Sequence, residues 1–300
     1  MRSLFGSALL LLLLSQIASG QAPPFQDLLR WYEYDPKAPL ELKEESTQGR
    51  EGLKVLSVSY ASPKGGRVPA YIVVPPGKGP FAGLIFMHPA GRDVGRAYFL
   101  DEAVALSKSG AVSILIDAPF VRPSPQPLFA FTEKDRDGIV QCVIDLRRAV
   151  DVLTSRSDVD AKRIGYVGFS YGATVGGILS GVDRRFKTFV LVGGGPKLTS
   201  FLRTLQAPPI EQLRKAGKLE TYLKTMTTID PDQYVRHATP ATILFQNGRR
   251  DENVPVEQAF QYHQAASQPK LVRWYDAGHS LNDEARRDRA AWLIDILGVK

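Results

Sequence analysis

The feature that most constrains the fold of this chain is a series of short apolar runs separated by helical segments. Residues 83–87 and 112–116 are dominated by apolar side chains, and a third run of this kind covers 163–167. Such runs are typical of strands that are buried on both faces of a sheet. Helical spacing at 97–109 and 137–154 separates them. The alternation predicts an α/β fold with a mostly parallel central sheet and helices on both faces.

The same pattern extends toward both ends of the chain. Three further strand patterns lie in the C-terminal half, at 188–192, 242–245 and 271–275. A last amphipathic helix is expected from about 284 to 297. At the other end, two strand patterns at 53–60 and 68–74 flank a Pro-Lys-Gly-Gly turn signal. These two segments are expected to form an antiparallel hairpin at the edge of the sheet.

The first residues have the pattern of a signal peptide. Arg2 precedes the apolar run 8–14, and the small residues 18–20 fit a cleavage site. The run is shorter than the roughly 20 apolar residues of a membrane span, although an uncleaved anchor is the alternative. We therefore expect a Sec-type signal peptide at 1–20 and an enzyme that is periplasmic or secreted. After leader cleavage we expect no stable membrane insertion.

Behind the leader we expect an irregular N-terminal arm at 21–50, with a short helix at about 25–31, and one α/β domain at 51–300. The net charge of +7 is spread along the chain and mixed with acidic residues. No cluster of lysine and arginine interleaved with aromatic residues is present, so we expect no nucleic-acid partner. Cys142 is the only cysteine. It excludes an internal disulfide and is expected to be a buried packing residue.

A Gly-x-Ser-x-Gly motif lies where the third strand pattern meets a helix. Gly168-Phe169-Ser170-Tyr171-Gly172 follows the apolar run directly and precedes a helix rich in small residues. A serine on so sharp a turn is held in a strained conformation with its hydroxyl exposed at the top of the sheet. The helix also directs its N-terminal amides toward a developing anion. Ser170 is therefore the candidate nucleophile.

This region resembles the α/β-hydrolase superfamily. The stretch 158–177, DVDAKRIGYVGFSYGATVGG, is most similar to the dienelactone-hydrolase-like and acetyl-xylan-esterase-like branch. Dienelactone hydrolases use a cysteine nucleophile where this chain has Ser170, so their specific reaction is not carried over. The resemblance covers about residues 50–297 and implies an α/β-hydrolase fold. It also implies that 196–236 forms a small helical cap or lid insertion.

The resemblance implies a base and an acid for Ser170 in the chain order serine, acid, histidine. Of the four histidines, His279 follows the last strand pattern, where the superfamily carries its base. His88 is expected to brace its own loop, and His237 and His263 to lie on the surface. Asp251, in a G-x-x-D-x-x-V-P segment, is the expected acid.

Other roles for the acidic residues remain open at this point. Asp251 could instead pair with Arg249 or Arg250. Glu252 is adjacent to Asp251 and could be mistaken for the acid. Two more carboxylates, those of Asp276 and Asp283, lie near His279 in sequence.

The tetrahedral intermediate of such a reaction needs preorganised donors. One is expected to be the backbone N–H of Tyr171, the residue after the nucleophile. The second is expected in the loop 88–93, which resembles the oxyanion loop of the superfamily but has Pro89 where glycine is usual. Proline cannot donate, and aligning the motifs assigns the second donor to the N–H of Ala90. The histidines lack the close spacing of a metal site, and no nucleotide-binding motif follows a strand, so we expect no metal and no cofactor.

Two segments are expected to border the substrate pocket. The first is 119–136, with Phe120, Phe129 and Phe131, and the second is the insertion 196–236. Arg92 and Arg122 could hold an acidic group of a substrate, but we expect both to be exposed to solvent.

The sequence as a whole predicts an exported serine hydrolase. We expect it to cleave a small-molecule or sugar-linked ester through a Ser-His-Asp triad and an acyl-enzyme intermediate. A small serine peptidase of the prolyl-oligopeptidase type is the alternative enzyme, because its catalytic domain shares the motif and the residue order. A non-catalytic binding protein of the same fold is the third interpretation, although it predicts the loss of a triad member.

Overall fold

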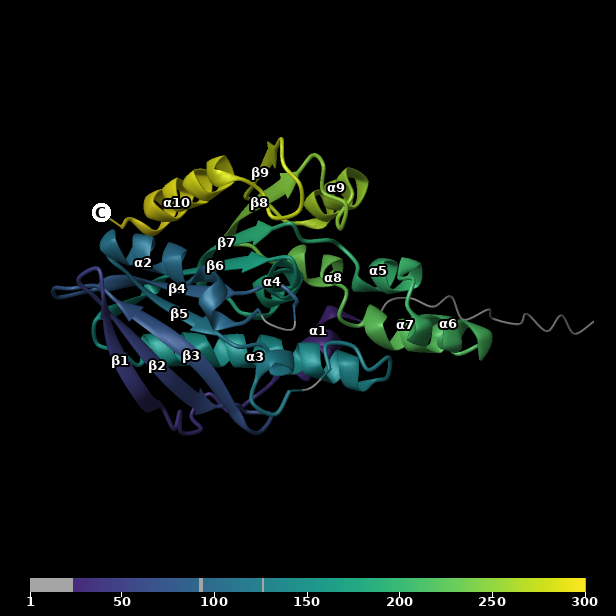
Figure 1. The fold of residues 1–300 in the computed structure, drawn as a ribbon, viewed down its shortest axis with the longest axis horizontal. Coiled ribbons are helices and arrows are strands. Elements are labelled where there is room, and N and C mark those ends of the chain that lie inside the picture. The colour runs from purple at the N-terminus through teal and green to yellow at the C-terminus, as the bar shows by residue number, and fades with distance from the viewer. Residues whose placement is uncertain (1–23, 92–93, 126, 300) are drawn as a thin grey trace, which may run out of the picture.

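A nine-stranded sheet forms the centre of the molecule (Figure 1). The structure is a computed structural model that describes residues 24–91, 94–125 and 127–299, so the expected signal peptide and Arg92 lie outside the described residues. The strand order is β1-β2-β3-β5-β4-β6-β7-β8-β9. The strands are β1 (Lys43–Arg50), β2 (Leu53–Ala61), β3 (Arg67–Val74), β4 (Phe81–Met87), β5 (Ala111–Ile116), β6 (Val159–Phe169), β7 (Phe186–Val192), β8 (Thr242–Gly248) and β9 (Lys270–Tyr275).

In the order of the strands across the sheet, the six strands from β5 through β4 to β9 are parallel, and β1, β2 and β3 are paired antiparallel. β4 pairs in parallel with β5 and β6, and the parallel pairing continues through β7 and β8 to β9. β3 joins this unit antiparallel to β5, and β2 and β1 continue outward in antiparallel pairs. The mostly parallel sheet expected from the sequence is confirmed.

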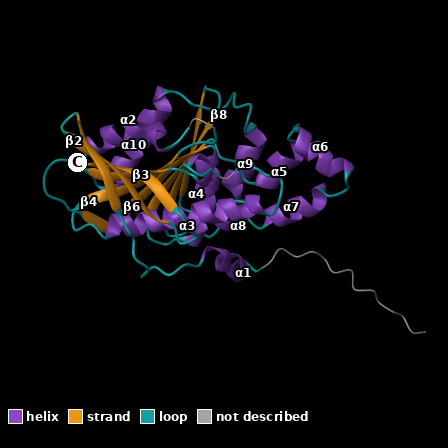
Figure 2. Cartoon of the chain, turned by 60° about the horizontal axis from the view of Figure 1, so that its bottom comes forward, coloured by secondary structure: helices purple, strands orange, loops and turns teal. Residues whose placement is uncertain are grey.

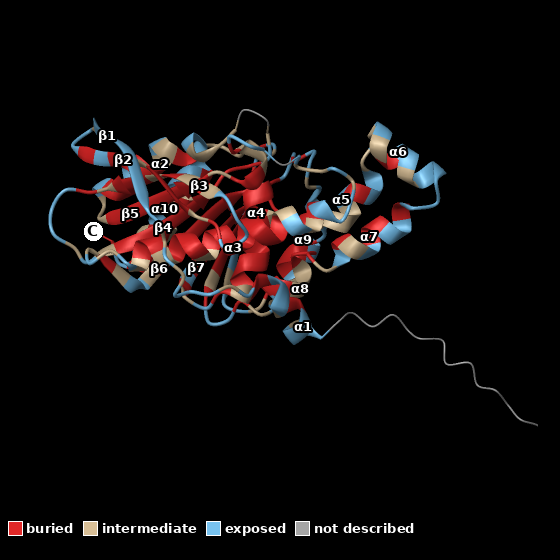
Figure 3. Cartoon of the chain, turned by 90° about the horizontal axis from the view of Figure 1, so that it is seen from below, coloured by how far each residue is buried: buried red, intermediate tan, exposed pale blue. Residues whose placement is uncertain are grey.

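Helices cover both faces of the sheet. Successive residues of β4 point to opposite faces, because side chains alternate along a strand. Leu84 and Phe86 pack with Val104 of α2 and Leu293 of α10, whereas Ile85 and Met87 belong to the cluster of the other face. Figure 2 shows the sheet between α2 and α10 on one side and α3 and α4 on the other. Figure 3 shows that α3 and α4 are the most completely buried helices.

The helices and short 3-10 turns have the following bounds. They are α1 (Phe25–Leu29), η1 (Arg30–Tyr32), η2 (Arg96–Phe99), α2 (Leu100–Lys108), η3 (Pro119–Val121), α3 (Lys134–Thr154), α4 (Tyr171–Val182), α5 (Leu198–Thr204), α6 (Pro208–Lys215), α7 (Leu219–Thr227), α8 (Asp232–Val235), α9 (Val256–Ala265) and α10 (Asp283–Leu297). The segment 196–236 is thus helical, as expected. Figure 1 shows α5, α6 and α7 beyond the end of the sheet toward which the arrows of β6 and β7 point.

The N-terminal arm is only partly irregular. The short helix expected near 25–31 is present as α1, but residues 43–50 form β1, which pairs with β2. The hairpin of β2 and β3 therefore forms as expected, but β1 and not the hairpin occupies the edge of the sheet. β1 escaped prediction because its residues are almost all exposed, so no apolar alternation marks it. An exposed polar strand is typical of a sheet edge.

The side chain of Arg122, expected at the surface, is buried. Arg122 is only 9% exposed, and its guanidinium contacts the Asp145 carboxylate of α3 at 2.6 Å. The expectation of a solvent-exposed Arg122 is therefore wrong, because the pair with Asp145 allows the charge to be buried. Cys142 is buried, as expected, and burial raises the pKa of its thiol to about 12.

His263 of α9 is also buried, contrary to expectation. Its side chain lies between Phe245 and Trp274, and its Nε2 is 2.9 Å from Oδ1 of Asn247. Burial, together with the charge of Lys270, lowers the pKa of His263 to about 4. The helical pattern around His263 does not show that this position of α9 faces the sheet.

The buried His263 predicts a loss of stability in mild acid. In the unfolded chain its pKa is near 6.5, so the unfolded state binds the proton first and is favoured as the pH falls. The contribution is fully present above pH 6.5, and about 3 kcal/mol at most is lost as the pH falls toward 4. Urea unfolding at pH 7.5 and pH 4.5 measures this loss. The loss should shrink in His263→Gln, whereas an equal loss in wild type and variant would assign the acid sensitivity to other groups.

Candidate active site

Ser170 occupies the sharp turn between β6 and α4. Its backbone has φ 54° and ψ −109°, a conformation that non-glycine residues rarely adopt. The N–H of Ser170 donates to the carbonyl of Val192 in β7 at 2.8 Å, and its own carbonyl accepts from the N–H of Thr174 at 3.0 Å. These two bonds hold the turn in its strained conformation, with the side chain at the carboxyl end of the sheet.

The two glycines of the motif allow close contacts that a larger residue would prevent. A Cβ atom at Gly168 would lie 2.3 Å from the carbonyl oxygen of Gly172, and one at Gly172 would lie 2.2 Å from that of Met87. Both distances are far below van der Waals contact. Gly172 thereby lets the start of α4 approach the end of β4, where the loop of Ala90 begins.

Ser170, His279 and Asp251 are brought together from three separate segments of the chain. Nε2 of His279 lies 2.9 Å from Oγ of Ser170, and Nδ1 lies 2.8 Å from Oδ2 of Asp251. The His279 ring also contacts Phe169, at 4.9 Å between ring centroids. An Nδ1–H donated to the carboxylate leaves Nε2 free to accept the proton of the serine hydroxyl.

The Asp251 carboxylate is oriented by its own loop. Its side chain is fully buried, and Oδ1 accepts hydrogen bonds from the N–H groups of Asn253 and Val254, both at 2.9 Å. Arg250, one possible alternative partner, pairs instead with Asp276 at 3.3 Å. A fixed carboxylate of this kind sets the tautomer of the histidine and stabilises its protonated form.

The remaining acidic candidates lie elsewhere. Glu252 is exposed, and Asp283 pairs with Arg286 on α10.

Close packing of the two loops that carry Asp251 and His279 requires Gly248. A Cβ at that position would lie 2.4 Å from the carbonyl oxygen of Ala277.

The loop that carries Ala90 is braced by His88, as expected. Nε2 of His88 accepts from the N–H of Ala118 at 3.1 Å, so Nδ1 carries the proton and donates to the carbonyl of Pro89 at 2.7 Å. Burial lowers the pKa of His88, which favours this neutral form. Ala90 and Tyr171 both line the cavity onto which Ser170 opens. Their two backbone N–H groups are the candidate oxyanion donors.

This cavity has a volume of about 160 Å³ and two kinds of lining. Its apolar side chains are Leu128, Phe129, Ile139, Val254, Leu198 and Phe201, and its polar ones, besides Ser170 and His279, are Thr174, Lys197, Asn253 and Gln258. Phe129 was a candidate from the sequence. Lys197, Asn253 and Gln258 were missed, because a polar residue near a helix start is no signal of a pocket by itself.

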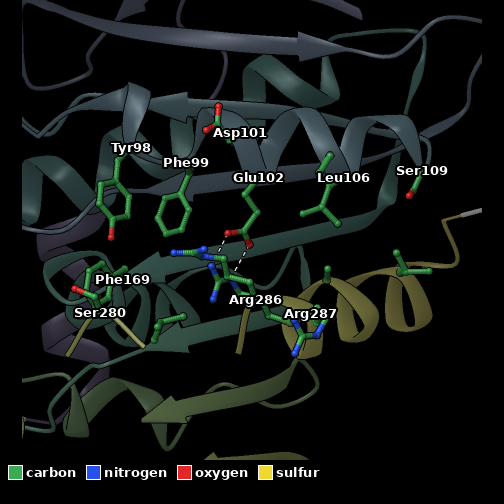
Figure 4. Close-up of a pocket in the computed structure, with 15 residues that line it drawn as sticks. Tyr98, Phe99, Asp101, Glu102, Leu106, Ser109, Phe169, Ser280, Arg286 and Arg287 are labelled. Atoms are coloured by element: carbon green, nitrogen blue, oxygen red, sulfur yellow. Dashed lines mark hydrogen bonds and ion pairs between the residues drawn. The ribbon is translucent and has the colours of Figure 1, made fainter. Parts of the chain in front are cut away.

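A larger groove of about 620 Å³ lies between α2 and α10 (Figure 4). Tyr98, Phe99 and Phe169 line it, and Glu102 and Arg289 form an ion pair across it. Phe169, Val192 and Ser280 line this groove, while their chain neighbours Ser170, Gly193 and His279 line the cavity. The groove thus adjoins the residues next to the reacting side chains, while Ser170 and His279 themselves line the smaller cavity.

The described residues offer neither a metal site nor a membrane-spanning helix. No group of three or more His, Cys, Asp and Glu side chains within them is arranged to hold a metal ion. Among the same residues, no helix has the length and apolar character needed to cross a bilayer.

Comparison with known proteins supports the fold. No curated protein sequence matches this chain. The acetyl xylan esterase of Paenibacillus sp. R4 superposes with a TM-score of 0.74 at 18% identity, covering 91% of this chain and 99% of that one. Acetyl xylan esterase 1 of Thermoanaerobacterium sp. JW/SL YS485 gives 0.75 at 14% identity, covering 91% and 93%. At these identities the likeness shows the fold.

A further similarity links the chain to peptidases. A prolyl endopeptidase structure superposes with a TM-score of 0.66 at 18% identity over 84% of this chain but only 40% of that one. The sequence profile of the prolyl oligopeptidase family matches residues 130–297, which is more than half of the chain and includes Ser170, Asp251 and His279. The chain therefore belongs to the prolyl oligopeptidase family and is a serine hydrolase of the α/β-hydrolase superfamily.

Proposed function

We propose that this protein hydrolyses esters of small acyl groups, with Ser170 as the nucleophile, His279 as the general base and Asp251 as the orienting acid. The observation that carries the proposal is the continuous chain of hydrogen-bonding atoms from Asp251 through His279 to Ser170, which ends at a cavity of about 160 Å³. A cavity of this size has room for an acetyl or another short acyl group.

In the first half of the reaction, Nε2 of His279 takes the hydroxyl proton as Oγ of Ser170 attacks the ester carbonyl. The oxyanion of the tetrahedral intermediate is bound by the N–H groups of Ala90 and Tyr171, at the positive end of the α4 dipole. His279 then gives its proton to the leaving alcohol, and the acyl group remains on Ser170. In the second half, His279 takes a proton from the water that attacks the acyl-enzyme, and it gives this proton to Oγ of Ser170 as the acid is released.

The lining of the cavity favours an ester that joins a small apolar acyl group to a polar alcohol. Leu128, Phe129 and Phe201 offer apolar contacts. Lys197, Asn253 and Gln258 offer hydrogen-bonding groups to hydroxyls. A sugar is an alcohol of this kind. The two acetyl xylan esterase structures share the fold and are consistent with this substrate class.

Peptide hydrolysis is the second candidate function. The match to the prolyl oligopeptidase family favours it, because the same triad attacks amide carbonyls in serine peptidases. The chain spans less than half of the prolyl endopeptidase that it resembles, so the activity of that whole protein is not carried over.

A substrate panel separates the two candidates. Initial rates on an acetylated sugar, 4-nitrophenyl acetate and a prolyl 4-nitroanilide peptide are compared in wild type and Ser170→Ala. The proposal expects serine-dependent turnover of both esters and no serine-dependent cleavage of the peptide. A kcat/KM on the peptide above that on the acetylated sugar would replace the esterase proposal with the peptidase one.

We also propose that the protein acts outside the cytoplasm, on the basis of the leader pattern at 1–20. Expression of the full sequence in a bacterial host, followed by cell fractionation and N-terminal sequencing, tests this. A mature protein that begins near Gln21 in the periplasm or medium is expected. A full-length protein in the cytosol would contradict the proposal.

A further inference from the structure

A single buried carboxylate holds together two segments that form one wall of the cavity. Asp135 lies in the first turn of α3 and is only 3% exposed. Its Oδ1 accepts from the N–H of Ala130 at 2.6 Å, and its Oδ2 accepts from the N–H of Phe131 at 2.8 Å and from the Tyr222 hydroxyl at 2.7 Å. The first two donors belong to the loop before α3, and the third belongs to α7 of the helical insertion.

The loop held by Asp135 carries residues of the cavity. Leu128 and Phe129 line the cavity, directly before Ala130 and Phe131. Phe131 has a φ of 60°, which a non-glycine residue adopts only when its surroundings hold it there. The bond from its N–H to the Asp135 carboxylate, charge-assisted and 2.8 Å long, supplies this constraint.

Aromatic contacts connect the same loop to the insertion. Phe131 contacts Tyr222 of α7 at 6.2 Å between ring centroids, and Phe129 contacts Phe201 of α5 at 6.5 Å. Phe129 and Phe131 are themselves 6.2 Å apart. These four rings form an aromatic wall (Phe129, Phe131, Phe201 and Tyr222), of which Phe129 and Phe201 face the cavity. Because Phe201 is 42% exposed, packing alone does not fix this wall.

We propose that Asp135 is a positioning residue that fastens the aromatic wall and thereby limits the length of the acyl group that the cavity accepts. For its substrate, this inference rests on the proposed esterase function. Asp135 touches neither Ser170 nor His279 and acts through Phe129 and Phe201. The carboxylate is required because all three of its partners donate, and only a group with two acceptor oxygens satisfies them.

The test uses Asp135→Asn, which keeps the size of the side chain but replaces one acceptor oxygen with a donor. The side-chain NH₂ group of the new asparagine would face the N–H of Phe131, and two donors cannot form a hydrogen bond with each other. The loop that carries Phe131 should therefore move away from residue 135. We expect kcat/KM for 4-nitrophenyl acetate to fall about tenfold, while kcat/KM for 4-nitrophenyl octanoate rises or is unchanged. The acyl-length ratio, which is kcat/KM for the acetate divided by kcat/KM for the octanoate, should therefore fall by at least about tenfold. Tyr222→Phe removes only the bond to α7 and should shift the ratio in the same direction by about threefold.

Asp137→Asn is the matched control. It removes a carboxylate from the same turn of α3, but Asp137 is exposed and pairs with Arg136. Its acyl-length ratio should equal that of wild type. A proportional loss on all esters in Asp135→Asn, or an unchanged ratio in both Asp135→Asn and Tyr222→Phe, would overturn the proposal. Tyr222→Phe keeps the test decisive if Asp135→Asn fails to fold.

A second readout separates this inference from the proposed function. Phosphonylation of Ser170 by a methyl and by an octyl fluorophosphonate needs an activated serine but no ester turnover. The rate ratio of the two probes should move toward the octyl probe in Asp135→Asn. A wild type that is phosphonylated but cleaves no ester would reject the esterase function, while the two rates would still decide the role of Asp135.

Discussion

Replacement of Ser170 by alanine is expected to lower kcat/KM for 4-nitrophenyl acetate by about five orders of magnitude. The hydroxyl oxygen of Ser170 is the attacking atom, and it lies 2.9 Å from Nε2 of His279, the base that takes its proton. Alanine keeps the Cβ atom and the N–H bond to Val192, so the strained turn should form as in wild type. Ester hydrolysis under steady-state conditions measures the loss, and thermal unfolding verifies the fold.

Ser280→Ala is the matched control for this prediction. Ser280 follows His279 directly, is exposed and lines the groove between α2 and α10. Its loss should leave kcat/KM within about twofold of wild type, because surface changes of this kind have small effects. If Ser170→Ala retained most of the activity while Ser280→Ala lost it, the nucleophile would have been assigned to the wrong serine.

Asp251→Asn is expected to lower kcat by about four orders of magnitude at neutral pH. The side-chain oxygen that accepts from Asn253 and Val254 should stay in place, because turning the amide would set its NH₂ group against two donors. The amide NH₂ then replaces Oδ2, which at 2.8 Å is nearer to Nδ1 of His279 than Oδ1 at 3.0 Å, and this favours the tautomer in which Nδ1 accepts. Nε2 must carry the proton in that tautomer and cannot take the proton of Ser170.

The adjacent carboxylate provides the comparison for this variant. Glu252→Gln makes the same change of charge one residue away, on an exposed side chain, and should keep nearly full activity. Measurements of kcat from pH 6 to 10 should show that Asp251→Asn recovers part of its activity at high pH, where hydroxide from the solvent can take the proton of the serine hydroxyl in place of His279. Activity of Asp251→Asn close to wild type would exclude Asp251 as the orienting acid.

Much of the fold could be predicted because local signals coincide with it. Buried parallel strands appear as continuous apolar runs, and the motif around Ser170 marks a sharp turn from a strand to a helix between two glycines. His279 and Asp251 were expected from the resemblance to the α/β-hydrolase superfamily, and both follow predicted strands, whose carboxyl ends meet at one edge of a parallel sheet. The structure brings both residues to Ser170 with hydrogen-bonding distances.

The features that escaped prediction depend on contacts between distant segments. β1 has no apolar alternation because it is an exposed edge strand, and Arg122 and His263 are buried only because Asp145 and Asn247 meet them in the folded chain. Asp135 and Tyr222 are separated by 87 positions and share no motif. A charged side chain near a helix start is usually exposed, so its role in the aromatic wall is visible only in three dimensions.

The central claim, that Ser170 is a nucleophile activated by His279, is tested most directly by locating the adduct of a fluorophosphonate probe with peptide mass spectrometry. Wild type, Ser170→Ala and His279→Ala are treated alike. We expect one adduct on the peptide that contains Ser170, none in Ser170→Ala and a rate of labelling reduced by at least about a thousandfold in His279→Ala. An adduct on another residue, or no adduct on a folded wild type, would contradict the claim.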